Sequence, residues 1–363
     1  MTRARELAEL GAAYDSGALS NRNIIINGAM QVSQRGTSES GISVSQYANA
    51  PDRFKFETSS AGTWTLSQST TAPDGFSNSY KFDCTTADGS LSAGDYLQLS
   101  HYIEGQNLQH LQKGSSSAKK LTLSFHVRSA KTGTYIVEFY DADNSRSNSQ
   151  SYTISSANTW EKKTITIDGD TSGAFGNDNG GSLGIFFYLA AGSNFTSGTL
   201  NTSWGSRTLA NVAVGQVNLA DSTSNDWYIT GVQLEIGTEA TPFEHRSFGD
   251  ELARCQRYYN RSYPYGTATG AADNNTPIHH MSRGGSYNII GQFFHPRDMR
   301  AAPTVVLYNP NDGTVNQLKG DGNSFANAAV LKNTAKGACM FVNATSITET
   351  VFLSVHATFD AEL

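Results

Sequence analysis

The sequence predicts an all-β protein made of β-sandwich domains. Charged residues make up 16 % of the 363 residues, whereas Gly, Ser, Thr and Asn are abundant beside many Tyr and Phe. This composition favours short strands joined by many turns. Leu121–Arg128 alternates apolar and polar residues without a fault, which is typical of a strand with one buried face. The expected order is an N-terminal segment (1–50), a jelly-roll β-sandwich (51–246), a short hinge helix (247–261) and a C-terminal β-sandwich (262–363).

The N-terminal segment is too poor in apolar residues to bury a core of its own. Residues 3–14 favour a short helix with Leu7 and Leu10 on one side. Ile24, Ile25 and Ile26 then predict a short strand that ends in an Asn-Gly turn. Because so short a helix is marginal alone, we expect this segment to dock on another part of the chain or on copies of itself.

The jelly roll is predicted from a series of short stretches with strand patterns. They are Phe54–Phe56, Thr63–Leu66, Ser79–Phe82, Asp95–Tyr102, Leu121–Arg128, Tyr135–Tyr140, Lys163–Ile167, Leu183–Ala190 and Trp227–Ile236. Two long polar loops, 168–182 and 191–206, are candidates for functional loops. Three tryptophans alternate with strand residues and are expected in the core, namely Trp64, Trp160 and Trp227. Trp204 stands in a polar loop, so we expect it to be exposed and to meet a glycan or a neighbouring subunit.

The junction after the jelly roll changes its periodicity. The alternation of Trp227–Ile236 slips once, at Gly231, where a bulge is expected. Pro242 cannot donate to a sheet, so the strand should stop before it. Beyond Gly249, helical spacing places Leu252, Cys255, Gln256 and Tyr259 on one face. For Tyr258 and Tyr259, packing inside the protein is preferred over contact with a ligand.

The C-terminal region predicts a second β unit. Its strand candidates are Tyr287–Phe294, Thr304–Tyr308, Ala328–Leu331, Cys339–Val342 and Val351–Phe359. Long polar stretches at 266–285 and 309–327 separate them and are expected to be loops.

Several classes of function are disfavoured by the residues themselves. The net charge of -6 argues against nucleic-acid binding, and no apolar run reaches the roughly 20 residues that insertion into a membrane needs. The first residues lack the apolar core of a signal peptide, so synthesis and retention in the cytoplasm are expected. Three scattered cysteines give no disulfide framework.

No cofactor or metal site is predicted either. His279 and His280 are adjacent, so on a strand they would point to opposite faces. Asp141–Ser145 has acidic residues at alternate positions but lacks the glycine and glutamate of an EF-hand. A hairpin turn is preferred, and a structural calcium stays the alternative. No nucleophile elbow, phosphate loop or paired glycosidase carboxylates stand out.

Two stretches resemble bacteriophage tail-fibre and receptor-binding proteins. One is Asn-Arg-Asn, an aliphatic run, Asn-Gly and Gln-Val within residues 21–36. The other is Val-Gln-Leu-Glu-Ile-Gly, Ala-Thr-Pro-Phe-Glu and Ala-Arg-Cys-Gln-Arg-Tyr-Tyr within residues 232–259. The order of strands also resembles the carbohydrate-binding-module-like jelly rolls of phage fibres.

This resemblance implies a non-enzymatic virion protein of the phage tail that attaches the particle to a host-cell glycan or protein. The N-terminus would bind other tail or baseplate proteins, and the chain would form a homotrimer. Candidates for trimerisation and attachment are Leu7, Leu10, Ile24, Ile25 and Ile26. Candidates for receptor or glycan contact are Trp204, His279, His280, Tyr287 and Tyr308, the last four on loops of the C-terminal tip. The alternatives are a tail-associated polysaccharide depolymerase and a purely structural baseplate or capsid-decorating protein.

Overall fold

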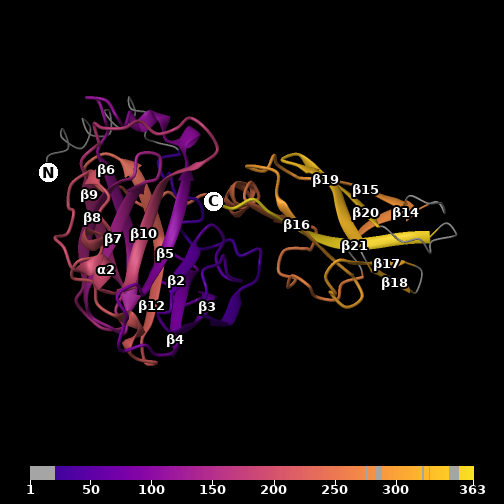
Figure 1. The fold of residues 1–363 in the computed structure, drawn as a ribbon, viewed down its shortest axis with the longest axis horizontal. Coiled ribbons are helices and arrows are strands. Elements are labelled where there is room, and N and C mark those ends of the chain that lie inside the picture. Colours follow the sequence, from indigo (N-terminus) through magenta and orange to yellow (C-terminus); the bar gives the residue numbers. More distant parts are fainter. Residues whose placement is uncertain (1–20, 275–276, 283–287, 321–322, 327, 343–350) are drawn as a thin grey trace. The chain divides into compact units, whose positions relative to one another are not determined.

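The computed structural model describes residues 21–363 except 275–276, 283–287, 321–322, 327 and 343–350, and almost all of its regular structure is strand (Figure 1). The chain divides into two compact units. The N-terminal unit contains the residues up to Gln31, Ser40–Gln46 and Phe54–Arg246. The C-terminal unit contains Val32–Glu39, Tyr47–Arg53 and Ser247–Leu363. Each unit is therefore assembled from segments that are separated in sequence.

The N-terminal unit is a sandwich of two six-stranded antiparallel sheets, which confirms the all-β sandwich prediction. The first sheet has the order β1-β3-β4-β12-β6-β9 and the second β11-β8-β7-β10-β5-β2. The strands are β1 (Ser38–Ile42), β2 (Lys55–Ser59), β3 (Thr63–Ser69), β4 (Ser79–Thr86), β5 (Tyr96–Glu104), β6 (Leu121–Ser129), β7 (Gly133–Asp141), β8 (Arg146–Ile154), β9 (Glu161–Ile167), β10 (Gly181–Ala191), β11 (Gly205–Ser206) and β12 (Asp226–Ile236). Short helical turns are η1 (Gly105–Asn107), η2 (Gln109–Leu111), α2 (Ser193–Thr196), η3 (Leu209–Asn211) and η4 (Leu219–Asp221).

Aromatic side chains fill the space between the two sheets. Phe187 of β10 lies 5.1 Å from Phe125 of β6 and 6.4 Å from Trp227 of β12, measured between ring centroids. Trp64 and Trp227 are fully buried, as expected. Trp160 is only half-buried and packs edge-on against Tyr228, so its assignment to the core was partly wrong.

The bulge expected at Gly231 is present. The register of β12 against β6 shifts between Thr230 and Gln233, and Gly231 has a φ of +62°. A Cβ at this position would lie 2.6 Å from Phe76 and 2.9 Å from the His126 ring. Glycine is therefore required both by the backbone conformation and by the close approach of these rings.

The strand expected at Ile24–Ile26 does not form. These residues lie in an irregular segment that docks on β12, where Ile24 N donates to Leu234 O and Val232 N donates to Gly28 O. Asn23 explains why, because its side chain bonds Val232 O and the Leu234 amide and so occupies groups that a strand would use. Ile25 is fully buried within its own chain. Leu7 and Leu10 lie outside the described residues.

Each of the nine strand candidates of the jelly roll overlaps an observed strand, but β1, β8 and β11 were missed. β8 reads Arg-Ser-Asn-Ser-Gln-Ser-Tyr-Thr-Ile and contains no alternating aliphatic residues at its start. Nevertheless, it forms a continuous hairpin with β7 from Gly133–Ile154 to Asp141–Arg146. The turn expected at Asp141–Ser145 is present and closes this hairpin.

The C-terminal unit is also built of antiparallel strands. β21 pairs with β13, β14, β16 and β17, while β15, β20 and β19 form a separate three-stranded sheet. The strands are β13 (Tyr259–Arg261), β14 (Ile278–Ser282), β15 (Asn288–Phe294), β16 (Thr304–Tyr308), β17 (Gln317–Gly320), β18 (Asn323–Ala326), β19 (Ala328–Thr334), β20 (Gly337–Val342) and β21 (Val351–Asp360). The predictions for β15, β16, β19, β20 and β21 are confirmed, whereas β13, β14, β17 and β18 were not foreseen.

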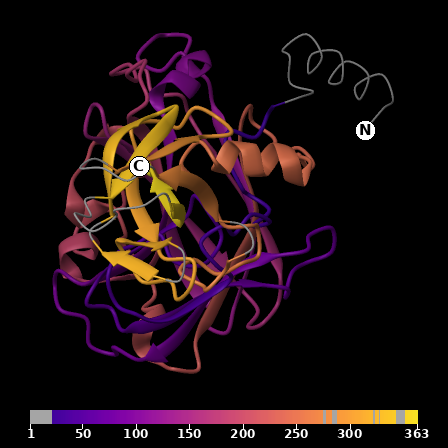
Figure 2. The same cartoon turned by 90° about the vertical axis from the view of Figure 1, so that its right-hand side faces the viewer.

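The helix expected after Gly249 is shorter than predicted. Helix α3 spans Phe248–Cys255 (the orange coil in Figure 2), and the Ser247 hydroxyl caps it by accepting from Asp250 N. Tyr259 belongs to β13, which pairs with β21. Because Tyr259 and its neighbours pair with a strand far along the chain, tertiary pairing overrides the helical spacing.

A buried ionic network joins the separated segments of the C-terminal unit. Glu362 pairs with Arg53 and Arg35, and Arg35 also pairs with Asp52 and Asp360. The two guanidinium groups lie over tyrosine rings, Arg53 at 3.4 Å from the Tyr258 centroid and Arg35 at 3.8 Å from that of Tyr259. Tyr258 and Tyr259 are buried, which confirms their packing role.

Candidate functional site

The candidates in the C-terminal unit do not lie where the sequence placed them. His279 and His280 are inside β14 and Tyr308 is the last residue of β16, so none of the three is on a loop. β14 pairs with β21, so a stretch that was expected to be a polar loop forms a strand. β16 also pairs with β21 and coincides with the strand candidate Thr304–Tyr308, so Tyr308 ends a strand. Tyr308 is half-buried, with its ring 6.0 Å from that of Tyr263. Tyr287 lies outside the described residues.

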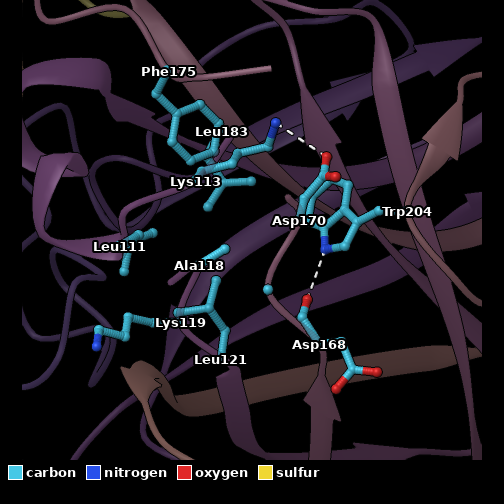
Figure 3. A pocket seen from close by; sticks show the side chains of 11 residues that line it. Leu111, Lys113, Ala118, Lys119, Leu121, Asp168, Asp170, Phe175, Leu183 and Trp204 are labelled. Carbon is cyan, nitrogen blue, oxygen red and sulfur yellow. Dashed lines mark hydrogen bonds and ion pairs between the residues drawn. The ribbon is translucent and has the colours of Figure 1, made fainter. Parts of the chain in front are cut away.

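Trp204 is half-buried and has a partner of its own. Figure 3 shows its indole Nε1 donating to the main-chain oxygen of Asp168, over 2.9 Å. Its ring lines a small pocket together with Leu111, Phe175 and Leu183. The unfilled space there holds about one water molecule, which is too little for a sugar ring. Trp204 is thus less exposed than expected, because its indole packs against the loop 168–175, and its contact with a glycan or a neighbouring subunit stays a prediction.

A row of aromatic rings lies on the outer side of the second sheet, which faces away from the first sheet, and its middle ring, Phe186, is itself buried. Phe187 points between the sheets, so Phe186 points outward. Gly184, on the same outward face of β10, is directly opposite Tyr102 on β5 and Tyr140 on β7. The Phe186 ring lies 5.4 Å from that of Tyr102 and 5.7 Å from that of Tyr140. We call Tyr102, Phe186 and Tyr140 the aromatic strip.

Gly184 makes this arrangement possible. A Cβ on Gly184 would lie 2.6 Å from the Phe186 ring and 3.1 Å from that of Tyr102. The edge of the Phe186 ring therefore lies against the glycine, close to the edge of the Tyr102 ring. β5, β10 and β7, which carry the strip, run side by side in Figure 1.

Fixed polar groups border the strip on one side. Glu138, opposite Phe186 in register, accepts two hydrogen bonds from Arg207, at 2.6 Å from Nε and 2.9 Å from Nη2. The Tyr188 hydroxyl donates to the same carboxylate over 3.1 Å. Arg207 also lies over the Tyr140 ring, 4.5 Å from its centroid. Arg207 is therefore held in place both by a carboxylate and by an aromatic ring.

A second polar group lies on the β2 side of the strip. Glu57 accepts from Gln98 Nε2 at 2.6 Å and forms an ion pair with Lys55 Nζ at 3.0 Å. Burial and the nearby Glu57 carboxylate raise the pKa of Tyr102, so its hydroxyl stays protonated and can donate a hydrogen bond. Each charge at this face thus has an opposite partner.

Only part of this face reaches solvent. Val212 and Ala213, from the segment after β10, pack with Ile136, Phe186 and Tyr188 and bury this part of the face. At the other end Tyr102 and Tyr140 are half-buried, and the side chains of Arg207 and Lys55 are 22 % and 29 % exposed. Flat aromatic rings beside fixed donors and acceptors suit a ligand with apolar ring faces and hydroxyl edges.

The aromatic strip was missed from the sequence. The signal was present in β10, where Phe186 and Tyr188 occupy the positions that alternate with Ile185, Phe187 and Leu189. Large aromatic residues on both faces of a strand indicate that its outer face is also covered, either by another part of the protein or by a ligand. Arg207 and Glu138 gave no such signal, because their pairing depends on the tertiary fold.

One arrangement in the C-terminal unit has the composition of a hydrolase triad. Ser262 Oγ lies 3.0 Å from His356 Nδ1, and His356 Nε2 lies 3.0 Å from the main-chain oxygen of Asp273. However, Ser262 Oγ accepts a hydrogen bond from Ala357 N, and His356 is fully buried beneath the Tyr263 ring. These contacts tie β21 to its neighbours, and we interpret the three residues as structural.

The described part of the chain contains neither a membrane-spanning helix nor a cluster of metal-ligating side chains. No helix in it is long and apolar enough to cross a membrane. Within the same residues, no three His, Cys, Asp or Glu side chains gather in a way that could hold a metal ion.

Comparison with known proteins gives structural similarity alone. No protein-family model and no curated protein sequence matches the chain. Among solved structures, the enzymatically active domain of tailspike protein 4 of bacteriophage CBA120 is 14% identical with a TM-score of 0.29, over 59% of this chain and 21% of that one. A family 11 carbohydrate-binding module of Clostridium thermocellum, in complex with a mixed-linked tetrasaccharide, is 12% identical with a TM-score of 0.29, over 56% of this chain and 99% of that one.

A third similar structure is TmCBM61 in complex with β-1,4-galactotriose, which is 9% identical with a TM-score of 0.30, over 60% of this chain and 100% of that one. The chain thus spans about a fifth of the tailspike domain but nearly all of the two binding modules. TM-scores this low carry no argument about function. The sandwich assignment rests on the two sheets themselves.

Proposed function

We propose that this chain is a non-enzymatic attachment protein of a bacteriophage tail, which binds glycans of the host surface through the aromatic strip. The strip itself is the observation that carries the proposal. Its half-buried tyrosines and the held Arg207 place aromatic rings beside a fixed charged group on a sheet, which is the combination that sugar-binding sites use. The place in a phage tail is supported by the motifs within residues 21–36 and 232–259.

Neutral glycans are the favoured ligands. Glu138 is neutralised by Arg207, and Glu57 by Lys55. An acidic sugar would have to compete with Glu138 for Arg207 and would leave that fully buried carboxylate without its cation. Hydroxyl groups, in contrast, do not compete for the charge of Arg207.

The absence of catalysis is part of the same proposal. A glycosidase needs one carboxyl group that is free to give and take a proton. Glu138 is fully buried and committed to Arg207 and Tyr188, which disfavours that role. Incubation with surface polysaccharide should release no reducing ends, and their release would favour the depolymerase alternative.

We also propose that the protein acts as a homotrimer, in which several weak glycan sites work together by avidity. Light scattering should give about three times the mass of the chain, and a stable monomer at micromolar concentration would contradict this. The suggested contacts of His279, His280, Tyr287 and Tyr308 with a receptor stay predictions.

The test uses the full chain and surface polysaccharides of susceptible cells. Tyr102→Ala with Tyr140→Ala should weaken binding by about tenfold or more, because both exposed ends of the strip are lost. Trp160→Ala is the matched control, since it removes a half-buried ring next to β9, in the other sheet, and should leave binding unchanged. Equal binding by the wild type and the double variant would refute the assignment of the site.

A further inference from the structure

The side chain of Lys113 lies in a cage of oxygen atoms. Its ammonium group contacts Asp141 Oδ2 at 2.5 Å, Gly173 O at 2.6 Å, Ser172 O at 2.9 Å and Asp170 Oδ2 at 3.1 Å. The side chain is only 4 % exposed. Figure 3 shows it directed toward Asp170 from the pocket below Phe175. Two carboxylates and two main-chain carbonyls therefore surround one buried positive charge.

The cage is held from outside by a second set of hydrogen bonds. Arg146 binds both oxygens of Asp170, at 2.7 and 2.9 Å. Asn144 donates its main-chain and side-chain N–H groups to Asp141. Oriented carboxylates combined with main-chain carbonyls are the ligand set of a calcium ion, and outer hydrogen bonds of this kind fix such ligands in metal sites.

The cage also closes a loop that has little core of its own. Asp170, Ser172 and Gly173 belong to the polar loop 168–180 between β9 and β10, whereas Asp141 ends β7. Gly114 N adds a further hydrogen bond to Asp170 O. The positive charge therefore ties the loop to the sandwich, as bound cations do in loops without aliphatic residues.

We propose that Lys113 is an internal replacement for a divalent cation: its ammonium occupies a calcium-type site, makes the N-terminal unit independent of metal, and leaves a cation site when its side chain is removed. This inference does not depend on the proposed glycan binding. Without Lys113, the two carboxylates and Arg146 carry a net charge of about -1. The space that the Lys113 side chain occupied, called the channel below, admits water to complete the coordination of an ion.

The affinity of the opened site should be modest. Four protein oxygens are fewer than calcium prefers, and Arg146 repels a second cation, so we expect a Kd on the order of 1 mM. At about 10 mM calcium this corresponds to a rise in melting temperature of about 3 to 6 °C for a unit of this size.

The experiment compares the full-length wild type, Lys113→Ala and Lys113→Met by thermal unfolding, in EDTA and in 10 mM calcium chloride. Tryptophan fluorescence follows the N-terminal unit, which contains all four tryptophans. Wild type should melt at the same temperature in both buffers. Lys113→Ala should melt lower in EDTA and regain about 3 to 6 °C in calcium. Lys113→Met fills the channel with an uncharged chain, so it should melt lower and gain nothing.

Each other outcome overturns the proposal. If Lys113→Ala is as stable as the wild type in EDTA, the Lys113 ammonium does not stabilise the loop 168–180 against the sandwich. A destabilised variant without a calcium response, or one that is insoluble in both buffers, shows that the cage is not a cation site. A calcium response of the wild type or of Lys113→Met places the ion elsewhere.

Discussion

Glu362→Ala should selectively destabilise the C-terminal unit. The carboxylate of Glu362 is 3 % exposed, and the side chain of its partner Arg53 is not exposed at all. Removing one member of a buried ion pair leaves an uncompensated charge and costs about 3 to 5 kcal/mol. Because a domain of this size has a total stability of about 5 to 15 kcal/mol, a large share would be lost. The expected fall in melting temperature is about 10 to 20 °C.

Asp360→Ala is the matched control. Asp360 pairs with Arg35 at 2.9 Å, but its side chain is 42 % exposed. Solvent screens such a pair, so its loss should cost less than about 1 kcal/mol. Glu362→Gln keeps the shape of the side chain and should fall between the two alanine variants.

The assay separates the two units. Calorimetry detects unfolding of the whole chain, whereas tryptophan fluorescence reports only the N-terminal unit, where Trp64, Trp160, Trp204 and Trp227 all lie. Glu362→Ala should lower one calorimetric transition and leave the fluorescence transition in place. Equal effects of Glu362→Ala and Asp360→Ala would refute the reasoning, because burial would then not decide the cost.

Three further predictions concern the candidate site, the cation cage and the unit boundaries. Gly184→Ala should weaken glycan binding by about 2- to 10-fold, because a Cβ displaces the Phe186 ring; unchanged affinity in calorimetric titration would contradict it. Burial alone would raise the pKa of Asp170, but hydrogen bonds from Arg146, the Ser172 amide and Lys113 outweigh it and hold the pKa of this carboxyl below its usual value. The unfolded state therefore binds the proton more tightly, and stability is lost as the pH falls below about 4; acid titration should show a flatter profile for Asp170→Asn. Exchange of 262–363 for the equivalent part of a related protein should give insoluble protein, whereas an exchange that also carries 32–53 should stay soluble, because Arg35, Asp52 and Arg53 lie in that segment.

Local pattern was sufficient for most of the strands and for one irregularity within them. Alternation located β6, β10 and β12, and a single slip in that alternation located the bulge at Gly231. These features are visible in sequence because the period of two follows from the backbone of a strand, whatever its neighbours are. β8 escaped because its inward positions carry Asn148 and Gln150, which pack on polar partners instead of an aliphatic core.

The tertiary structure alone decided which side chains meet. The register of β5 and β7 against β10 lines up Tyr102, Gly184 and Tyr140 into the base of the aromatic strip. Arg35 and Glu362 stand at opposite ends of the chain and yet share one buried network. Strand propensity is a local property, whereas the register of the strands and the pairing of segments that are distant in sequence are determined by burial of the whole core. A shift of one residue in register would turn the side chains of a strand to the other face of the sheet.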